Sequence, residues 1–262
     1  MTSKEPWADL IPRIGTAFLL IGSAAIALLL GGNTFGIFLL VAVALLHWEL
    51  GCMLSPLSRQ TGYFAAAFAG LFFLLAIASV SLEWSLVCVI LGSAVQIMFF
   101  QRFKKTGLAI SLAIFLVSLL FLNLRLYSDL SVILWLVGVV VMTDLGGYFG
   151  GRIFGGPKLT PRYSPKKTWS GALTGLAFAL VFTVIFGEDI GVGLSLKNTI
   201  IFSLFLSIAS QIGDIYESAL KRACNVKDSS SLLPGHGGFM DRFDGLVAAS
   251  LAFSPITLLD AL

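Results

Sequence analysis

Residues 211–245 read QIGDIYESALKRACNVKDSSSLLPGHGGFMDRFDG, and they lie between the last two apolar runs of the chain, residues 199–212 and 246–259. The segment carries charged side chains of both signs, although only 12% of all residues are charged. Ionisable groups beside a lipid bilayer are energetically costly and are usually functional. The contrast indicates a membrane protein with its chemistry concentrated in polar segments such as this one.

The composition of the whole chain excludes an ordinary soluble domain. Its 262 residues are 57% hydrophobic, and the mean hydropathy is +0.95. The three cysteines are isolated from one another, so neither a disulfide framework nor a zinc site is expected. No basic stretch suggests nucleic-acid binding. We expect an all-α, polytopic integral membrane protein.

Apolar runs predict about nine transmembrane helices, because a hydrocarbon core of about 30 Å requires about 20 apolar residues per helix. The sixth and eighth runs are expected to continue as helix into the polar segments that follow them. The first run is not expected to be a cleavable signal peptide, because no small-residue cleavage site closes it. We divide the chain into N-terminal scaffold helices with possible dimer contacts (residues 1–130) and a catalytic region (residues 131–262). The runs are residues 14–30, 34–46, 62–80, 85–100, 107–124, 131–142, 171–186, 199–212 and 246–259.

The basic residues predict the orientation in the membrane. If the N-terminus is cytoplasmic, nine spans place all 17 Lys and Arg residues except Arg125 and Lys197 on the cytoplasmic side. Cytoplasmic loops are enriched in Lys and Arg. We therefore expect an external C-terminus and an active site at the cytoplasmic boundary of the cell inner (plasma) membrane. The two long polar segments, residues 144–169 and 214–245, then share one face.

The first polar segment joins a glycine-rich helix end to a basic loop. Helical continuation places Asp144, Tyr148 and Arg152 on one face, while the glycines within residues 146–151 fit close helix packing equally well. Prolines at 157, 161 and 165 then force a loop. Hydroxyls and cations in such a loop suit a polyphosphate or a phospholipid headgroup, and nonspecific contact with anionic lipid is the alternative. The loop carries Lys158, Ser164, Lys166, Lys167 and Thr168.

The second polar segment supplies candidate metal ligands. Asp214 follows a run without charge, where an unpaired carboxylate is costly, and Asp241 and Asp244 lie one helical turn apart. Carboxylate oxygens beside phosphate-binding cations suggest Mg²⁺. For Glu217 and Lys221, spaced i and i+4, helix stabilisation is a sufficient explanation.

Two further groups of polar residues leave alternatives open. The low-bulk core of residues 234–238, PGHGG, allows backbone N–H groups to approach a ligand. His236 within it is a candidate hydrogen-bond donor to phosphate, a proton carrier or a loop-ordering residue. In the first five spans, helix-end or interhelical hydrogen bonding is the favoured explanation for the buried polar residues. These are His47, Glu49, Gln96 and Asn123.

The polar segments together resemble a known family. Ser218-Ala-Leu-Lys221-Arg222 followed by residues 227–244, KDSSSLLPGHGGFMDRFD, resembles the signature of phosphatidate cytidylyltransferase, also called CDP-diacylglycerol synthase. The upstream Asp144-x-x-x-Tyr148-x-x-Gly-Arg152 and residues 158–169, KLTPRYSPKKTW, look like the other motif of that family. The sequence departs from the family pattern at Ser170, where many members carry Glu, and at Ser230, where many carry Gly.

The resemblance implies an activity and a set of site residues. The enzyme would condense CTP with phosphatidic acid, release pyrophosphate and leave CDP-diacylglycerol in the membrane for phospholipid biosynthesis. The resemblance also implies that Mg²⁺ is the cofactor and that the protein forms a homodimer. Asp214, Asp241 and Asp244 would hold the metal. The other implied catalytic residues are Lys221, Arg222, His236 and Arg242. The implied substrate-binding residues are Asp144, Tyr148, Arg152, Lys158, Ser164, Lys166, Lys167, Thr168, Ser218, Lys227, Asp228, Gly235, Gly237 and Gly238.

Two alternative functions remain on the sequence alone. A CDP-alcohol phosphotransferase is suggested by Asp241-x-x-Asp244-Gly245, but the residues that follow lack the second aspartate pair of that motif. A transporter or an anionic-lipid-binding membrane protein would use the basic loops differently. Transporters place their charges near the bilayer midplane, whereas these charges gather at the predicted cytoplasmic boundary.

Overall fold

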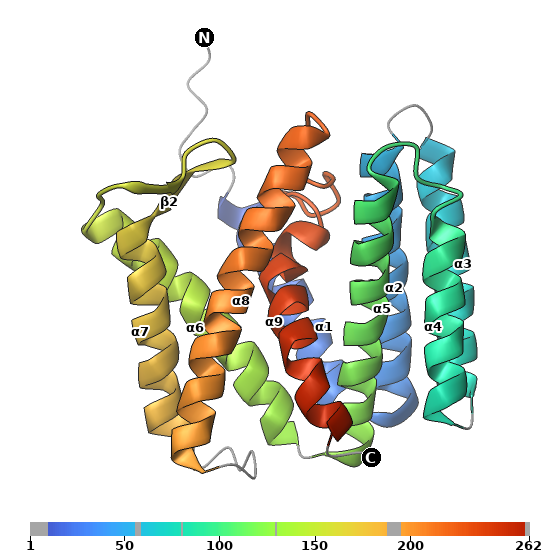
Figure 1. Cartoon of the computed structure of the whole chain (residues 1–262), viewed down its shortest axis with the longest axis horizontal. Coiled ribbons are helices and arrows are strands. Elements are labelled where there is room, and N and C mark those ends of the chain that lie inside the picture. Colours follow the sequence, from blue (N-terminus) through green and yellow to red (C-terminus); the bar gives the residue numbers. More distant parts are fainter. Residues whose placement is uncertain (1–9, 56–58, 80, 129, 188–194, 260–262) are drawn as a thin grey trace. The chain divides into compact units, whose positions relative to one another are not determined.

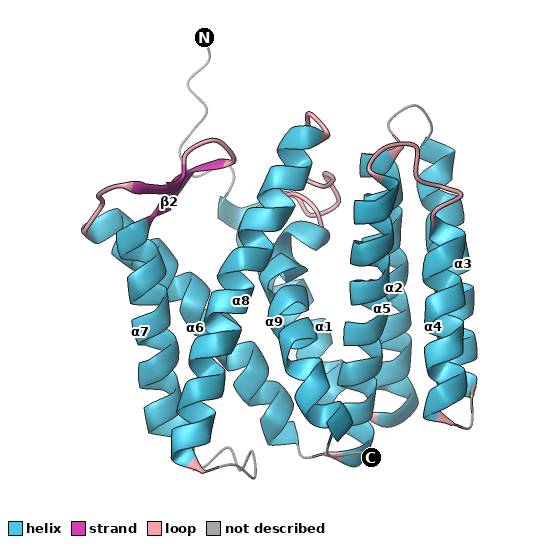
Figure 2. Cartoon of the chain, viewed as in Figure 1, coloured by secondary structure: helices cyan, strands magenta, loops and turns pink. Residues whose placement is uncertain are grey.

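The computed structural model describes residues 10–55, 59–79, 81–128, 130–187 and 195–259. In this part of the chain, nine helices account for nearly all regular structure, and a short hairpin supplies the rest (Figures 1 and 2). The all-α class predicted from the sequence is confirmed. The helices are α1 (Leu10–Leu30), α2 (Gly32–Leu54), α3 (Arg59–Ala78), α4 (Leu82–Gln96), α5 (Lys104–Tyr127), α6 (Leu130–Ile153), α7 (Trp169–Phe186), α8 (Leu196–Ala223) and α9 (Met240–Leu259).

Each predicted apolar run overlaps one of these helices. As expected, α6 and α8 continue as helix well beyond their apolar runs, to Ile153 and Ala223. By length and composition, six of the described helices could cross a membrane: α2, α3, α5, α6, α7 and α8. Large apolar side chains such as Phe18 and Leu91 are exposed on the helix surfaces, as expected where lipid surrounds the protein. The chain is therefore a multi-pass membrane protein.

The chain divides into two compact units. Unit 1 comprises Met1–Phe115 and Val226–Arg242, and unit 2 comprises Leu116–Asn225 and Phe243–Leu262. The segment that precedes α9 thus groups with the N-terminal helices, and α9 itself begins in unit 1. The division into a scaffold and a catalytic region concerns function and remains a prediction.

In unit 2, glycines bring α6 and α7 into close contact. A Cβ atom at Gly146 would lie 2.5 Å from the carbonyl oxygen of Thr174, and one at Gly175 would lie 2.8 Å from the carbonyl oxygen of Thr143. The Thr174 hydroxyl also donates to the Gly146 carbonyl at 2.8 Å. Small residues allow this approach between membrane helices. Close packing is therefore the role of Gly146, as the spacing of the glycines allowed.

Hydroxyl groups hold α8 against α6 and α7. Ser203 accepts hydrogen bonds from the Trp135 indole at 3.1 Å and from the Thr183 hydroxyl at 2.6 Å. One turn further along α8, Ser207 accepts from the Thr143 hydroxyl at 2.8 Å. Such bonds replace contacts with water inside an apolar bundle.

The basic loop of the first polar segment differs from the prediction, because it contains an antiparallel hairpin. Strands β1 (Lys158–Thr160) and β2 (Ser164–Thr168) pair with Lys158 opposite Thr168. Between α6 and β1, Gly155 and Gly156 adopt positive φ values of 59° and 99°, which L side chains rarely tolerate. The Thr168 hydroxyl then accepts from the Gly171 N–H at 3.1 Å and caps α7. The hairpin is thereby tied to both neighbouring helices.

In unit 1, two buried polar side chains form the expected interhelical bonds. The His47 Nε2 atom lies 2.9 Å from the Ser111 hydroxyl, and the Gln96 amide donates to the Ala65 carbonyl at 2.9 Å. Asn123 instead donates to Leu119 in its own helix, α5. The bonds of Glu49 are different in kind and are described with the candidate site.

We expect Gly146→Ala to destabilise the protein by roughly 1–3 kcal/mol, because α6 and α7 must move apart to admit a methyl group. Thermal unfolding in detergent measures this change. Gly22→Ala in α1 is the matched control, because a Cβ atom there meets nothing within 4 Å. Equal stability of the two variants would contradict the packing assigned to Gly146.

Candidate functional site

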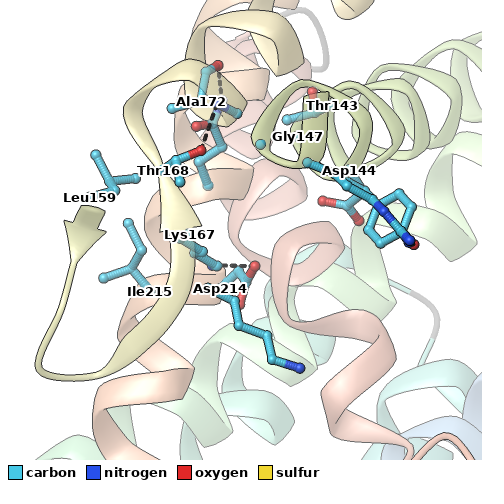
Figure 3. Close-up of a pocket in the computed structure, with 15 residues that line it drawn as sticks. Thr143, Asp144, Gly147, Leu159, Lys167, Thr168, Ala172, Asp214 and Ile215 are labelled. Carbon is cyan, nitrogen blue, oxygen red and sulfur yellow. Dashed lines mark hydrogen bonds and ion pairs between the residues drawn. The ribbon is translucent and has the colours of Figure 1, made fainter. Parts of the chain in front are cut away.

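A cavity of about 380 Å³ lies in unit 2 between the polar ends of α6 and α8, the beginning of α7 and the hairpin (Figure 3). Its α6 wall is formed by the face predicted from the i, i+4, i+8 spacing. Arg152 donates to the Tyr148 hydroxyl at 2.8 Å on this face. The predicted site residues that line the cavity are Asp144, Tyr148, Arg152, Lys166, Lys167, Thr168 and Asp214.

The cavity joins the two polar segments through an ion pair. Lys167 on β2 pairs with Asp214 on α8, shown by a dashed line in Figure 3. Both side chains are partly exposed, at 24% and 35%. The lining contains three cationic and two carboxylate side chains, from Arg152, Lys166, Lys167, Asp144 and Asp214. This arrangement suits an anionic ligand that brings a divalent cation with it.

Further along α8, a buried ion pair lies near the carboxyl group of Asp244. Lys221 and Glu217 form the predicted i,i+4 pair at 3.2 Å, with side-chain exposures of only 11% and 7%. Asp244 precedes the apolar part of α9. Burial raises the pKa of Asp244, a hydrogen bond with Glu217 and the charge of Lys221 lower it, and the negative charge of Asp214 raises it further. The carboxyl groups on α8 and α9 are thus close enough to interact.

The carboxyl groups of Asp214 and Asp244 are the candidate ligands for a metal ion in unit 2. Among the described residues, no group of three or more His, Cys, Asp or Glu side chains is arranged to hold a metal. Mg²⁺, however, needs only one or two protein carboxylates when substrate phosphates complete its shell. Asp214 and Asp244 repel each other electrostatically, which a shared cation would relieve. Asp214 and Asp244 are therefore the candidate residues of unit 2 that would hold a magnesium ion bound together with a phosphorylated ligand.

Asp241 lies in unit 1, at the start of α9, where it orders the preceding loop. Its Oδ2 atom accepts the backbone N–H groups of Ser229 at 3.0 Å and Gly238 at 2.7 Å. Arg242 beside it donates to the His236 carbonyl at 2.8 Å. Sequence spacing suggested that Asp241 and Asp244 point to one place, but their described partners belong to different segments.

Three backbone amides of the PGHGG loop donate to residues that flank the loop, and the predicted approach of its amides to a ligand remains a prediction. The N–H groups of His236 and Gly237 donate to the Leu233 carbonyl at 2.9 and 3.0 Å, and that of Gly238 donates to Asp241. The His236 ring lies 2.5 Å from the Thr16 hydroxyl. This contact is compatible with a loop-ordering role for His236, and the other two roles remain predictions.

A buried carboxyl group, for which the sequence analysis favoured helix-end or interhelical hydrogen bonding, holds this loop. Glu49 on α2 is fully buried, and its two oxygens accept four hydrogen bonds. The donors are the hydroxyls of Ser229 (2.9 Å) and Ser230 (2.5 Å) and the backbone N–H groups of Phe239 (2.7 Å) and Met240 (2.6 Å). Its position near the end of an apolar run was the only signal in the sequence.

The remaining predicted residues do not line the cavity. In unit 2, Arg222 donates to the Tyr163 carbonyl at 3.4 Å, and Ser170, at the position of a family Glu, donates to the Gly155 carbonyl. Two lining residues, Thr143 and Gln211, were not predicted as site residues. The predicted residues outside the cavity lining are Lys158, Ser164, Ser218, Lys221, Arg222 and Asp244 in unit 2, and Lys227, Asp228, Gly235, His236, Gly237, Gly238, Asp241 and Arg242 in unit 1.

Curated proteins with similar sequences carry the name phosphatidate cytidylyltransferase. A phosphatidate cytidylyltransferase of Brucella suis biovar 1 (strain 1330) is 49% identical over 124 residues, covering 46% of this chain and 44% of the relative. Proteins of the same name from Haemophilus influenzae and Bacillus subtilis are 44% and 43% identical, over 49% and 48% of this chain and 46% of each relative. The matched region thus spans about half the length of these curated relatives.

The match to a protein family is longer than these pairwise matches. The cytidylyltransferase family matches residues 11–259, which include all nine helices almost completely. The cavity, the hairpin and the loop held by Glu49 all fall within this range. The chain belongs to the cytidylyltransferase family.

Proposed function

We propose that this protein is a phosphatidate cytidylyltransferase, which condenses CTP with phosphatidic acid to form CDP-diacylglycerol and pyrophosphate. The observation that carries the proposal is the cavity of unit 2. It gathers Arg152, Lys166 and Lys167 around the carboxylates of Asp144 and Asp214 at the polar end of helices long enough to cross a membrane. Family membership and the names of the relatives support the same reaction.

The chemistry requires little from a general base. A phosphate monoester has a second pKa near ~6, so the phosphatidate is largely a dianion at neutral pH. One of its oxygens attacks the α-phosphorus of CTP, a P–O bond to the β-phosphate breaks, and pyrophosphate leaves. The main barrier is repulsion between anions, so catalysis depends on neutralising charge and on in-line positioning.

The side chains of the cavity match these requirements. Lys166 and Lys167 are carried on a strand that is fixed at both ends, so their charges stay close to the cavity. Arg152 is oriented by its bond to Tyr148 and can bind a phosphate with two N–H groups. Lys221 is held by Glu217, which limits its movement. These residues would bind and orient the phosphates of both substrates.

Magnesium would be held by Asp214, Asp244 and, by the family resemblance, Asp241. Mg²⁺ supplies positive charge that offsets the charge of a triphosphate. Lys167, which pairs with Asp214, lies beside the first of these ligands. Lys227, Asp228, His236 and Arg242 remain candidates that the family resemblance alone supports.

The remaining features of the proposal concern the cellular setting. We propose nine transmembrane spans with a cytoplasmic N-terminus, an external C-terminus and a site that faces the cytoplasm of an inner (plasma) membrane. The distribution of Lys and Arg residues supports this orientation. A homodimer is proposed from the family resemblance. A site at the membrane surface would allow a soluble nucleotide to meet a lipid phosphate.

The alternative functions receive less support. The family match covers residues 11–259 and does not favour a CDP-alcohol phosphotransferase. The cavity lies at the polar end of α6 and α8, whereas a transporter would have its binding site near the bilayer midplane.

The direct test of the proposed function is the transfer of label from CTP into a lipid-soluble product. We expect purified protein in detergent, with radiolabelled CTP, phosphatidic acid and Mg²⁺, to form labelled CDP-diacylglycerol and pyrophosphate in equal amounts. A reaction that needs CDP-diacylglycerol and an alcohol instead would identify a phosphotransferase. Absence of product from folded protein at all substrate concentrations would exclude the proposed activity.

We expect Lys167→Gln to lower kcat by roughly 10²-fold, because it removes a cation that neutralises developing charge at the site. The charge-matched control is Lys197→Gln at the opposite end of α8, which should retain normal activity. Steady-state kinetics with CTP as the varied substrate measures both variants. Similar activities of the two variants would place the reaction away from this cavity.

Metal removal tests the carboxylates. We expect EDTA to abolish activity and added Mg²⁺ to restore it, because the substrate phosphates and Asp214 need a shared cation. Asp214→Asn should bind Mg²⁺–nucleotide more weakly, by about 10-fold or more, in isothermal titration calorimetry. Full activity in EDTA, or unchanged binding by Asp214→Asn, would remove the magnesium assignment.

A further inference from the structure

We propose that Glu49 is a positioning residue that holds the loop before α9 in the conformation that presents Asp241. This inference rests on the proposed function, because it concerns the site that performs that reaction. It assigns a role to a side chain on α2, which lies far from the family motifs in the sequence. Its basis is a set of hydrogen bonds within unit 1.

Both oxygens of the Glu49 carboxyl group are fully engaged. Oε1 accepts from the Ser230 hydroxyl and the Phe239 N–H, at 2.5 and 2.7 Å. Oε2 accepts from the Ser229 hydroxyl and the Met240 N–H, at 2.9 and 2.6 Å. A buried carboxyl group is costly unless donors surround it, and here each oxygen has one hydroxyl and one amide donor. Residues 229–240 thus supply four donors that together bind the Glu49 carboxyl group.

The two amide donors belong to the beginning of α9. Helix α9 starts at Met240, and the first N–H groups of a helix have no partner within the helix. A carboxylate normally satisfies such groups from a neighbouring position in the sequence. Here the carboxyl group comes from Glu49, a residue of another helix, so the start of α9 is fixed to α2.

The same segment carries Asp241, and the two carboxyl groups share a donor residue. Ser229 gives its hydroxyl to Glu49 and its backbone N–H to Asp241. Gly238 gives its N–H to Asp241, and a Cβ atom at Gly238 would lie only 2.8 Å from Glu49 Oε1. Glu49 and Asp241 therefore both accept hydrogen bonds from the segment that precedes α9. A displaced Glu49 carboxyl group changes the position of the Asp241 carboxylate.

The decisive variant is Glu49→Gln, which keeps the shape of the side chain and replaces one acceptor oxygen by an NH₂ donor. One backbone N–H, of Phe239 or Met240, then faces another donor. Glu83→Gln is the control in unit 1, because Glu83 is exposed in the first turn of α4. Hydrogen exchange of the substrate-free protein gives a readout that does not depend on activity.

We expect Glu49→Gln to increase amide exchange in peptides that cover residues 226–242, with little change in α3 and α4. Its kcat should fall by about 10–100-fold, and the Mg²⁺ concentration for half-maximal rate should rise, as for loss of a group that orients a metal ligand. Glu83→Gln should match the wild type in all three measurements. A buried residue that only stabilises the fold would leave the Mg²⁺ dependence of the folded enzyme unchanged.

Normal exchange and normal kinetics in folded Glu49→Gln would overturn the inference. So would a general loss of exchange protection with unchanged kcat and Mg²⁺ dependence, which would assign Glu49 to stability alone. If Glu49→Gln does not fold, Ser229→Ala decides the matter, because it removes one donor and retains the carboxyl group. That variant should show the same changes at smaller size, and wild-type values would contradict the proposal. If the wild-type protein makes no CDP-diacylglycerol, the proposed function fails, whereas the exchange experiment still tests whether Glu49 holds the loop.

Discussion

The need to satisfy polar groups inside an apolar bundle governs this structure. Water is absent from the hydrocarbon region, so each buried donor or acceptor must find a partner in the protein. In unit 2, the hydroxyls of Thr143, Ser203 and Ser207 meet this need by joining α6, α7 and α8. In unit 1, the carboxyl group of Glu49 meets it by holding a loop. In each unit, the polar contacts that satisfy these groups also fix the elements that carry them.

The same constraint explains why the cavity forms where it does. Glycines bring α6 and α7 together until their backbones are nearly in contact, and α8 is attached by hydroxyls. Beyond this packed region α6 and α8 continue with polar residues, and Lys166 and Lys167 of the hairpin line the cavity. A rigid apolar scaffold thus carries a charged cavity at its polar end. The proposed transfer between a soluble nucleotide and a lipid would require such a setting.

Two ion pairs involve side chains of α8, and they differ in their exposure to solvent. Lys167 pairs with Asp214, and Lys221 pairs with Glu217. The first pair is partly exposed, so separating its two charges to bind the proposed ligand would have a modest energetic cost. The second pair is buried, so it is better suited to hold Lys221 in place. Each pair joins a lysine to a carboxylate, but only the exposed pair is suited to separate when a ligand binds.

The sequence by itself determined the fold class, the approximate helices and the family, because these depend on local apolar runs and on short motifs. It also placed Asp144, Tyr148 and Arg152 on one face, since helical periodicity is a local property. Only the tertiary structure showed that β2 brings Lys167 to Asp214, and that a residue of α2 caps α9. Glu49 and Met240 are far apart in the chain, and no local pattern relates them. Their hydrogen bond forms because the buried carboxyl group needs donors and the first N–H groups of α9 have no acceptor within the helix. Folding brings these groups together.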